Sequence, residues 1–208
     1  MKTNIITVGR QPGSGGRLIA ARLSEMLGYQ VYDKELLNMA SRESGVNKEF
    51  FEKMDEKVSH STFGGLFGLR GVSGEDFYSG YYLSNETLFQ IQSDVIRRIA
   101  EEKSAIFLGR CADYVLKDHP SILSIFVSAD LPDRIQRVAK YMDYSEHKAK
   151  EWIAKMDKKR KSYYDYFSNK SWGDASSYHL CLNTSVLGIE SSAKLIFSFA
   201  QELFAKKY

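Results

Sequence analysis

The sequence predicts a three-layer α/β/α domain built around a five-stranded parallel sheet. Short apolar runs alternate with longer segments of helical periodicity along the 208-residue chain. Several of the short runs are continuously apolar, which is typical of strands buried on both faces. Parallel strands need crossovers of about a dozen residues or more, and the helical segments provide them.

The strands are expected at five short runs, the first of which is β-branched and leads into a glycine-rich turn. They cover residues 5–8, 30–32, 105–108, 122–127 and 178–182. Helices are expected at about residues 16–27, 34–44, 48–58, 85–102, 112–116, 132–142, 146–167 and 189–206. The helix near Pro132 has a strong start signal, because proline suits the first helical turn and Asp130 can cap it.

Composition predicts a soluble protein of the reducing cytoplasm. With 43% hydrophobic and 26% charged residues the chain can bury a full core, so we expect one domain with insertions. No apolar stretch approaches the roughly 18 residues of a membrane span. Residues 1–4 lead directly into the first strand without a signal-peptide pattern. Cys111 and Cys181 are too few for a disulfide framework or a cysteine-based metal site.

Positive charge is concentrated in one helical segment. The net charge of +3 is too small to indicate nucleic-acid binding by itself. Between residues 148 and 161, however, seven basic residues face two acidic ones: Lys148, Lys150, Lys155, Lys158, Lys159, Arg160 and Lys161 against Glu151 and Asp157. A solvated helix face is the simplest interpretation. The alternatives are a cation cluster that closes over polyphosphate and, less favoured, a surface that grips nucleic acid.

Residues 60–82 hold six glycines and six aromatic residues without clear periodicity. Long segments of this kind are usually functional or mobile. The simplest interpretation is a surface excursion whose aromatic side chains pack on this subunit or on a second one. The alternative is a flap that closes over a planar substrate. A homo-oligomer is compatible with the sequence, but no pattern in it indicates one.

A glycine-rich run after the first strand predicts a phosphate-binding loop. Gly13, Ser14, Gly15, Gly16 and Arg17 lie between that strand and a helix. At such a junction backbone N–H groups and the positive end of the helix dipole face an anion. Glycines remove the Cβ atoms that would block its approach. The alternative interpretation is a structural tight turn.

The loop departs from the ordinary P-loop pattern, G-x-x-x-x-G-K-[ST]. With Gly15 as the second glycine, the pattern fails at Arg10, Gly16 and Arg17. The lysine and the hydroxyl that ligates Mg²⁺ are therefore both absent. Arg10 and Arg17 are the nearby cations that can take the lysine's place, since arginine can donate two hydrogen bonds to phosphate, but neither can replace the hydroxyl.

Polar residues also follow the second and third predicted strands. The Asp33 carboxylate can face the phosphate site, hold Mg²⁺ through water, orient an acceptor oxygen, or cap the next helix. After the third strand, Gly109 permits close approach, and Arg110 supplies a planar phosphate donor. Asp113 can hold Arg110 or contact a base, and a purely structural Arg110–Asp113 pair is the simpler alternative. We expect no direct protein ligand to Mg²⁺.

The order of these features resembles the cytidylate kinase-like family of P-loop nucleoside-monophosphate kinases. The segments that carry the resemblance are "GSGGR", "VYDKELL", "FLGRCADYVL", "DKKRKSYYDYF" and "WGDASSYHLCLNTSVLGIE". They span nearly the whole chain, and "GSGGR" replaces the lysine-bearing loop of true cytidylate kinases. The resemblance implies a P-loop kinase fold with a nucleotide-binding insertion at about 34–103 and a helical lid at about 143–177. It also implies MgATP as phosphoryl donor and CMP or dCMP as a possible acceptor.

The resemblance assigns substrate contacts to two of the positions already named. Asp33 matches the aspartate of the substrate-binding "DTG" stretch, although Lys34-Glu35 replaces its Thr-Gly. Arg110 matches the arginine of the "GRD" motif, which contacts the monophosphate, although Cys111 replaces the aspartate of that motif. These departures leave the identity of the acceptor open.

The resemblance assigns the remaining positions to the donor and the lid. Residues 13–17 match the phosphate loop, and Thr184 and Gly188 border the adenine pocket. Asp157 and Arg160 match the lid and lie one turn apart on the same helix face.

We therefore expect ATP-dependent phosphoryl transfer to a nucleoside monophosphate. Arg110, Arg160 and either Arg17 or Arg10 would surround the transferring group. Two other functions stay open. One is a kinase of the same fold that acts on another small acceptor, and the other is a nucleotide-binding protein with weak or no catalysis, which the missing lysine favours.

Overall fold

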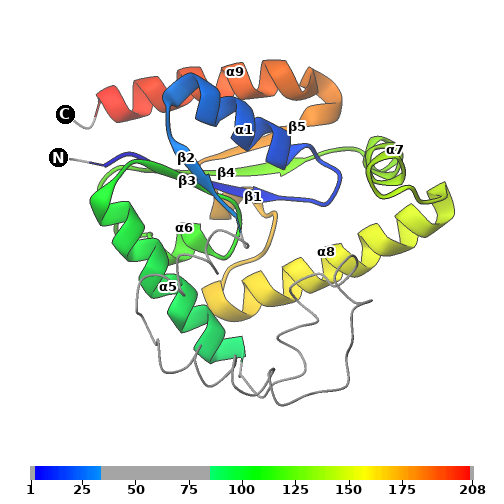
Figure 1. Cartoon of the computed structure of the whole chain (residues 1–208), viewed down its shortest axis with the longest axis horizontal. Helices are drawn as coiled ribbons and strands as arrows, with labels where there is room; N and C mark the ends of the chain where they lie inside the picture. Colours follow the sequence, from blue (N-terminus) through cyan, green and yellow to red (C-terminus); the bar gives the residue numbers. More distant parts are fainter. Residues whose placement is uncertain (1–2, 34–84, 207–208) are drawn as a thin grey trace, which may run out of the picture.

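The computed structural model describes residues 3–33 and 85–206. Two predicted helices, 34–44 and 48–58, and the segment 60–82 lie outside the described residues. Within the described part, the five predicted strands form one parallel sheet in the order β2-β3-β1-β4-β5 (Figure 1). The strands are β1 (Ile5–Arg10), β2 (Gln30–Tyr32), β3 (Ala105–Phe107), β4 (Ile122–Ser128) and β5 (Leu180–Asn183).

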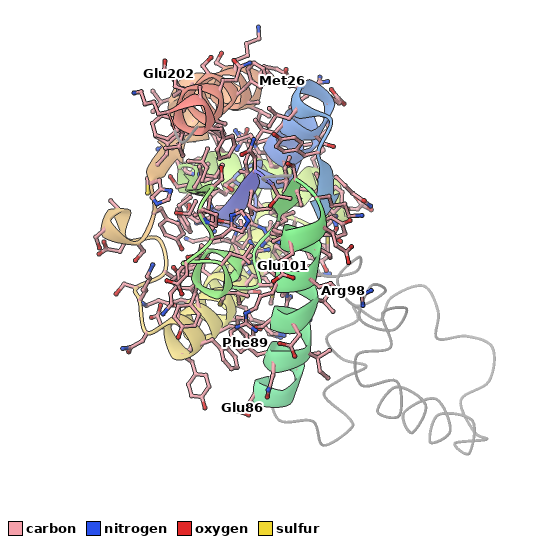
Figure 2. The ribbon with its side chains drawn as sticks, turned by 90° about the vertical axis from the view of Figure 1, so that its left-hand side faces the viewer. Met26, Glu86, Phe89, Arg98, Glu101 and Glu202 are labelled. Atoms are coloured by element: carbon pink, nitrogen blue, oxygen red, sulfur yellow. The ribbon has the colours of Figure 1, made fainter. Side chains whose placement is uncertain are left out.

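Helices cover both faces of the sheet, which confirms the predicted three-layer architecture. They are α1 (Gly16–Leu27), α5 (Asn85–Glu102), α6 (Ala112–Val115), α7 (Leu131–Met142), α8 (Glu146–Ser168) and α9 (Thr184–Ala205). In Figure 2, α1 and α9 lie on one side of the sheet and α5, α6 and α8 on the other. Figure 1 shows α7 beyond the carboxyl end of the sheet, on the same side of the molecule as the turn between β1 and α1.

Successive side chains of the central strand β1 enter different cores, which explains its unbroken apolar sequence. Ile6 packs in a cluster with Ile196 of α9. Ile5 packs in another cluster with Ile96 of α5. All four side chains are fully buried, and each burial of this kind stabilises the fold by about 1.5–3 kcal/mol.

The β1 strand continues two residues beyond its predicted end. Gly9 and Arg10 pair with Phe126 and Val127 of the longer neighbour β4. Apolar periodicity stops at Val8, so the sequence pattern misses an extension that depends on pairing with another strand. As a result, Arg10 belongs to the last position of the central strand.

The last strand and last helix begin at different residues from those predicted. β5 starts two residues late because Tyr178 packs with Phe126 and Tyr164 after the short 3₁₀ turn η1 (Ala175–Ser177). α9 starts five residues early, at Thr184, and is interrupted at Gly188, whose φ is 71° and ψ 168°. That kink explains why the periodic pattern becomes readable only after residue 188.

The predicted capping role of Asp130 is wrong. Asp130 stands at the N-cap position of α7, with proline in the first turn, but its side chain makes no capping hydrogen bond. Its Oδ1 instead accepts a hydrogen bond from Nδ2 of Asn183, the residue before α9, at 2.8 Å. Asp130 therefore connects the start of α7 to the start of α9.

Candidate functional site

The glycine loop between β1 and α1 is closely packed by neighbouring helices. Gly13 has a φ of 75° and Gly15 a φ of 83°, which glycine adopts without the strain that other residues incur. A Cβ atom on Gly13 would lie 2.6 Å from the carbonyl oxygen of Arg134 in α7, and one on Gly15 would lie 2.9 Å from Cδ1 of Ile189 in α9. The backbone conformation and the lack of space both require glycine at these positions.

Ser14 braces the loop from within. Its side chain is buried, and its Oγ donates a hydrogen bond to the carbonyl oxygen of Gln11 at 2.8 Å. The Ser14 carbonyl oxygen accepts a hydrogen bond from Oγ1 of Thr184 at 2.8 Å. The structure thus places both hydroxyl groups, Ser14 and Thr184, in contacts that hold the loop's shape.

Two arginines of α7 also hold the loop, and sequence reasoning missed them. Nε of Arg134 donates to the carbonyl oxygen of Pro12 at 2.8 Å. Nη1 of Arg137 donates to the carbonyl oxygen of Gly13 at 3.1 Å and to Oγ1 of Thr184 at 3.0 Å. The available signal was their three-residue spacing, which places both on one face of a helix that begins just after β4.

The guanidinium of Arg10 lies at the centre of the arginines that the sequence singled out. It rests against the backbone of Gly109, where any Cβ atom would collide with it. Burial lowers the pKa of Arg10 well below its usual value, and the positive charges of three other arginines add to this effect: Arg160, Arg110 and Arg17, in order of size. The negative charge of Asp33 acts in the opposite direction. Four guanidinium groups from β1, α1, the β3–α6 turn and α8 therefore converge here; we call them the arginine cluster.

Arg17 and Asp33 form an ion pair across the mouth of the loop. Nη2 of Arg17 lies 2.6 Å from Oδ2 of Asp33. The Arg17 side chain is 64% exposed and that of Asp33 19% exposed, so the pair contributes little to stability. The structure brings these two predicted site residues together, although no sequence pattern paired them.

Arg110 is presented by a strained turn. Gly109, Arg110 and Cys111 have successive φ angles of 80°, 59° and 53°. Non-glycine residues pay about 1–3 kcal/mol for this conformation, and such strain is concentrated at functional sites. The Arg110 guanidinium carbon lies 5.6 Å from the centre of the Tyr163 ring. The turn therefore directs Arg110 toward α8 and the other arginines of the cluster.

Asp113 has a partner other than the predicted Arg110. Its Oδ2 accepts a hydrogen bond of 2.6 Å from the hydroxyl of Tyr164 in α8. Burial raises the pKa of the Asp113 carboxyl above its usual value. The Asp113–Tyr164 bond connects α6 to α8 beneath the Arg110 turn.

Helix α8 connects to the surroundings of the glycine loop through two side chains, one bonded to the end of β1 and one to α7. Nη1 of Arg160 donates to the carbonyl oxygen of Arg10 at 2.9 Å. Oδ2 of Asp157 lies 2.7 Å from Nη2 of Arg134, so the predicted lid aspartate pairs with an arginine of α7.

The lysines of the basic segment lie on the solvent side of α8. All six are exposed: Lys148, Lys150, Lys155, Lys158, Lys159 and Lys161. This agrees with the simplest interpretation, a solvated helix face, and distinguishes Arg160 as the basic residue of the segment that turns inward.

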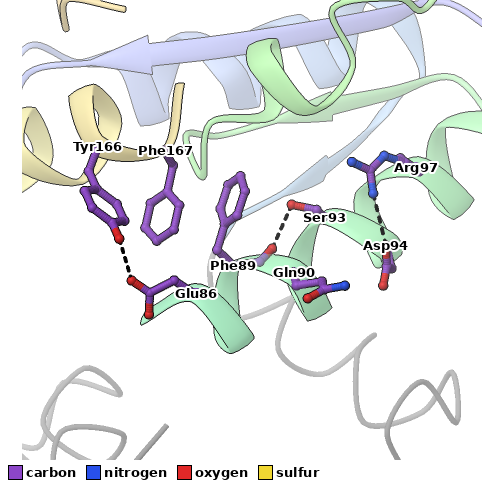
Figure 3. Close-up of a pocket in the computed structure, with 8 residues that line it drawn as sticks. All are labelled: Glu86, Phe89, Gln90, Ser93, Asp94, Arg97, Tyr166 and Phe167. Atoms are coloured by element: carbon purple, nitrogen blue, oxygen red, sulfur yellow. Dashed lines mark hydrogen bonds and ion pairs between the residues drawn. The ribbon is translucent and has the colours of Figure 1, made fainter. Parts of the chain in front are cut away.

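A cleft of about 500 Å³ lies between α5 and the end of α8 (Figure 3). Its lining combines aromatic rings with polar groups: Glu86, Phe89, Gln90, Ser93, Asp94, Arg97, Tyr166 and Phe167. Phe89 and Phe167 stack with ring centres 4.2 Å apart, and Tyr163 contacts both rings. Because Arg110 lies over Tyr163, the cleft adjoins the arginine cluster through that ring.

Residues 5–186 match the cytidylate kinase-like family. The chain belongs to the cytidylate kinase-like family. A cytidylate kinase of Methanopyrus kandleri is 28% identical over 193 residues, which cover 87% of this chain and 84% of that protein. Family membership confirms the resemblance seen in the sequence.

Solved structures show the same fold. An uncharacterized protein from Eubacterium ventriosum has a TM-score of 0.72 at 25% identity, covering 96% of this chain and 99% of that one. The shikimate kinase of Bacteroides thetaiotaomicron has a TM-score of 0.51 at 12% identity, covering 95% and 98% of the two chains. The second likeness concerns the fold alone, which is that of P-loop kinases.

The described site joins a closely packed glycine loop to a cluster of positive charge. The glycine loop leaves no room for side chains, and the arginine cluster supplies positive charge beside it. Residues 3–33 and 85–206 contain no group of three or more acidic, histidine or cysteine side chains arranged to hold a metal ion. Among them, the helices are also too short or too polar to cross a bilayer.

Proposed function

We propose that this member of the cytidylate kinase-like family transfers a phosphoryl group from ATP to a nucleoside monophosphate, with CMP and dCMP as the first acceptors to test. The observation that carries the proposal is the convergence of Arg10, Arg17, Arg110 and Arg160 beside a glycine loop. Phosphoryl transfer asks a protein mainly to position two anionic substrates and to offset their charge.

Each arginine has a distinct role in this proposal. The amide groups of residues 13–17 hold the donor phosphates, with Arg17 and Arg10 beside them. Arg110, presented by the strained turn, binds the acceptor monophosphate. Arg160 reaches the transferring group from α8, and closure of the 143–177 lid excludes water that would compete with the acceptor.

Magnesium would be held chiefly by the substrate phosphates. Mg²⁺ usually keeps several waters and binds one or two carboxylates together with phosphate oxygens. Asp33 is the carboxylate that would fill this role through water. Its hydrogen bond with Arg17 places it at the mouth of the glycine loop. When bound, the ion would offset charge on the donor phosphates.

The cleft between α5 and α8 favours a planar acceptor. Its stacked rings, Phe89 and Phe167, contribute an apolar wall, and Gln90 adds hydrogen-bonding groups to the lining. An aromatic wall with a few polar groups suits a nucleobase, whose faces stack and whose edges form hydrogen bonds. We propose that the base of the acceptor occupies this cleft while its phosphate reaches Arg110. Gln90→Ala should then raise the KM for the acceptor and leave the KM for ATP unchanged.

An ADP-release assay with MgATP and a panel of nucleoside monophosphates tests the function. Arg110→Ala and Arg160→Ala should each lower turnover by about 10³-fold, as expected for arginines that stabilise the transition state. Arg22→Ala is the matched control, because Arg22 is an exposed arginine outside the arginine cluster and pairs with Glu25 and Glu190.

Three outcomes distinguish the candidate functions. Normal turnover in both Arg110→Ala and Arg160→Ala contradicts the site assignment. Phosphorylation of a different small molecule supports a kinase of the same fold with another acceptor. ATP binding without turnover on any acceptor supports a nucleotide-binding protein.

A further inference from the structure

Two positions of the glycine loop have exchanged residue types relative to the ordinary P-loop pattern. That pattern places glycine at its first position and lysine at its seventh. With Gly15 as the second glycine of the pattern, these positions hold Arg10 and Gly16. The loop thus keeps one cation and one glycine at the two positions, in reverse order.

The two exchanged residues touch in the structure. A Cβ atom built on Gly16, the first residue of α1, would lie 2.7 Å from Cβ and 3.1 Å from Cγ of Arg10. Packed atoms do not approach so closely, so the stem of Arg10 fills the space in which a side chain at position 16 would begin. In this arrangement a long side chain at position 16 and the observed Arg10 exclude each other.

The far end of the Arg10 side chain lies among the other arginines of the cluster. Its guanidinium rests against Gly109, close enough to Arg160 and Arg110 that their charges lower its pKa. A partly buried cation beside other cations is unfavourable without an anion. A bound polyphosphate supplies that anion.

We propose that the Arg10 guanidinium performs the task of the P-loop lysine, delivered from the first loop position through the space that Gly16 leaves, and that it binds the β- and γ-phosphates of the donor. The assignment rests on the proposed function, since the donor is the nucleotide named there. Arg17 is less suited to the task, because its side chain is 64% exposed and its Nη2 bonds to Asp33.

Binding of the donor and turnover should both respond to a reciprocal exchange of the two residues. The readouts are calorimetric affinity for tripolyphosphate and for ATP, and the kcat of ADP release. Arg10→Gly should lower kcat by about 10²–10³-fold, the loss typical of a donor group aimed at developing charge. The double variant Arg10→Gly with Gly16→Lys, which restores the ordinary order, should recover kcat to within about tenfold.

A smaller change at position 16 gives a second test that needs no lysine. Gly16→Ala in the natural chain should displace the Arg10 stem and weaken tripolyphosphate binding by about tenfold or more, since charge-assisted hydrogen bonds to phosphate are lost. In the Arg10→Gly background the same alanine has room and should change the affinity less than about twofold. Circular dichroism and thermal unfolding confirm that each variant is folded.

The results separate this proposal from the proposed function. Equal tripolyphosphate affinity in Arg10→Gly and the natural chain overturns it, as does an equal effect of Gly16→Ala in both backgrounds. A folded double variant that turns over no faster than Arg10→Gly also overturns it. If no acceptor is phosphorylated but polyphosphate affinity depends on Arg10 as described, the proposed function fails and the assignment of Arg10 as the phosphate cation stands.

Discussion

Replacing Arg134 by methionine should destabilise the protein far more than removing an equally short ion pair at the surface. Arg134 is 6% exposed in its side chain, and it joins the Pro12 carbonyl of the glycine loop to Asp157 of α8. Methionine keeps most of the apolar stem and removes both interactions. The loss of stability in this variant therefore reports the contacts of the guanidinium and not the creation of a cavity.

The expected loss in the free energy of unfolding follows from those two contacts. A hydrogen bond to a neutral carbonyl contributes about 1 kcal/mol, and one to a charged group about 1.5–3 kcal/mol. Breaking a buried ion pair costs about 3–5 kcal/mol, and the lower end applies here because the Asp157 side chain is 28% exposed. We expect a loss of about 3 kcal/mol, which lowers the Tm by about 6–12 °C for a chain of this size.

Arg22→Met is the matched control for the thermal unfolding assay. Nε of Arg22 lies 2.8 Å from Glu190, but the arginine side chain is 47% exposed, so the expected loss is below about 1 kcal/mol. Adding Asp157→Asn to Arg134→Met should recover about 1 kcal/mol of stability, because it removes the negative charge that Arg134→Met leaves without a partner. If Arg134→Met shifts the Tm no further than Arg22→Met does, the reasoning is refuted.

Three further predictions concern other parts of the site. Gly13→Ala should abolish tripolyphosphate binding or destabilise the fold by more than about 3 kcal/mol in chemical denaturation. Gly28→Ala is its control, because Gly28 has a similar φ but nothing within 4 Å of an added Cβ; it should lower the free energy of unfolding by only about 1–2 kcal/mol. Arg17→Ala should change stability by less than about 1 kcal/mol while weakening tripolyphosphate binding in calorimetry, and an unchanged affinity would remove Arg17 from the phosphate site. Burial raises the pKa of Asp113 in the folded protein, so its contribution to stability falls as pH rises from the ordinary aspartate range through the raised pKa. Asp113→Asn keeps an acceptor for Tyr164 and should gain stability relative to the natural chain over that pH interval in urea titrations; a constant difference would argue against the raised pKa.

The strands of the sheet were predictable because each is marked by a pattern within its own short segment of sequence. Runs such as residues 122–127 are apolar on both faces except at Ser124, and burial between two helical layers favours that pattern. The described helices were also found within a few residues of their observed ends, except where a backbone irregularity intervened. Gly188 is the example, since its φ of 71° interrupts α9 and conceals the first turn of that helix.

The contacts of the site were less predictable because they join elements that are distant in sequence. The sequence placed Arg10, Arg110 and Arg160 at the site, and the structure shows that they converge. It did not reveal Arg134 and Arg137, whose contacts with the loop span more than 100 residues. Asp157 shows the same limit, because its helix face was predicted and its partner on another helix was not.

The contacts of α8 with the end of β1 and with Arg134 of α7 couple the helix thermodynamically to the glycine loop. Arg160 contacts the carbonyl of residue 10, and Asp157 holds the arginine that contacts the carbonyl of residue 12. Linkage is reciprocal, so if an ordered α8 strengthens anion binding at the loop, anion binding must stabilise the ordered α8 by the same free energy. Amide hydrogen exchange in the middle of α8 should therefore slow when polyphosphate binds the glycine loop, although α8 contributes no residue to that loop. The helix would then report occupancy of the donor site before any acceptor arrives.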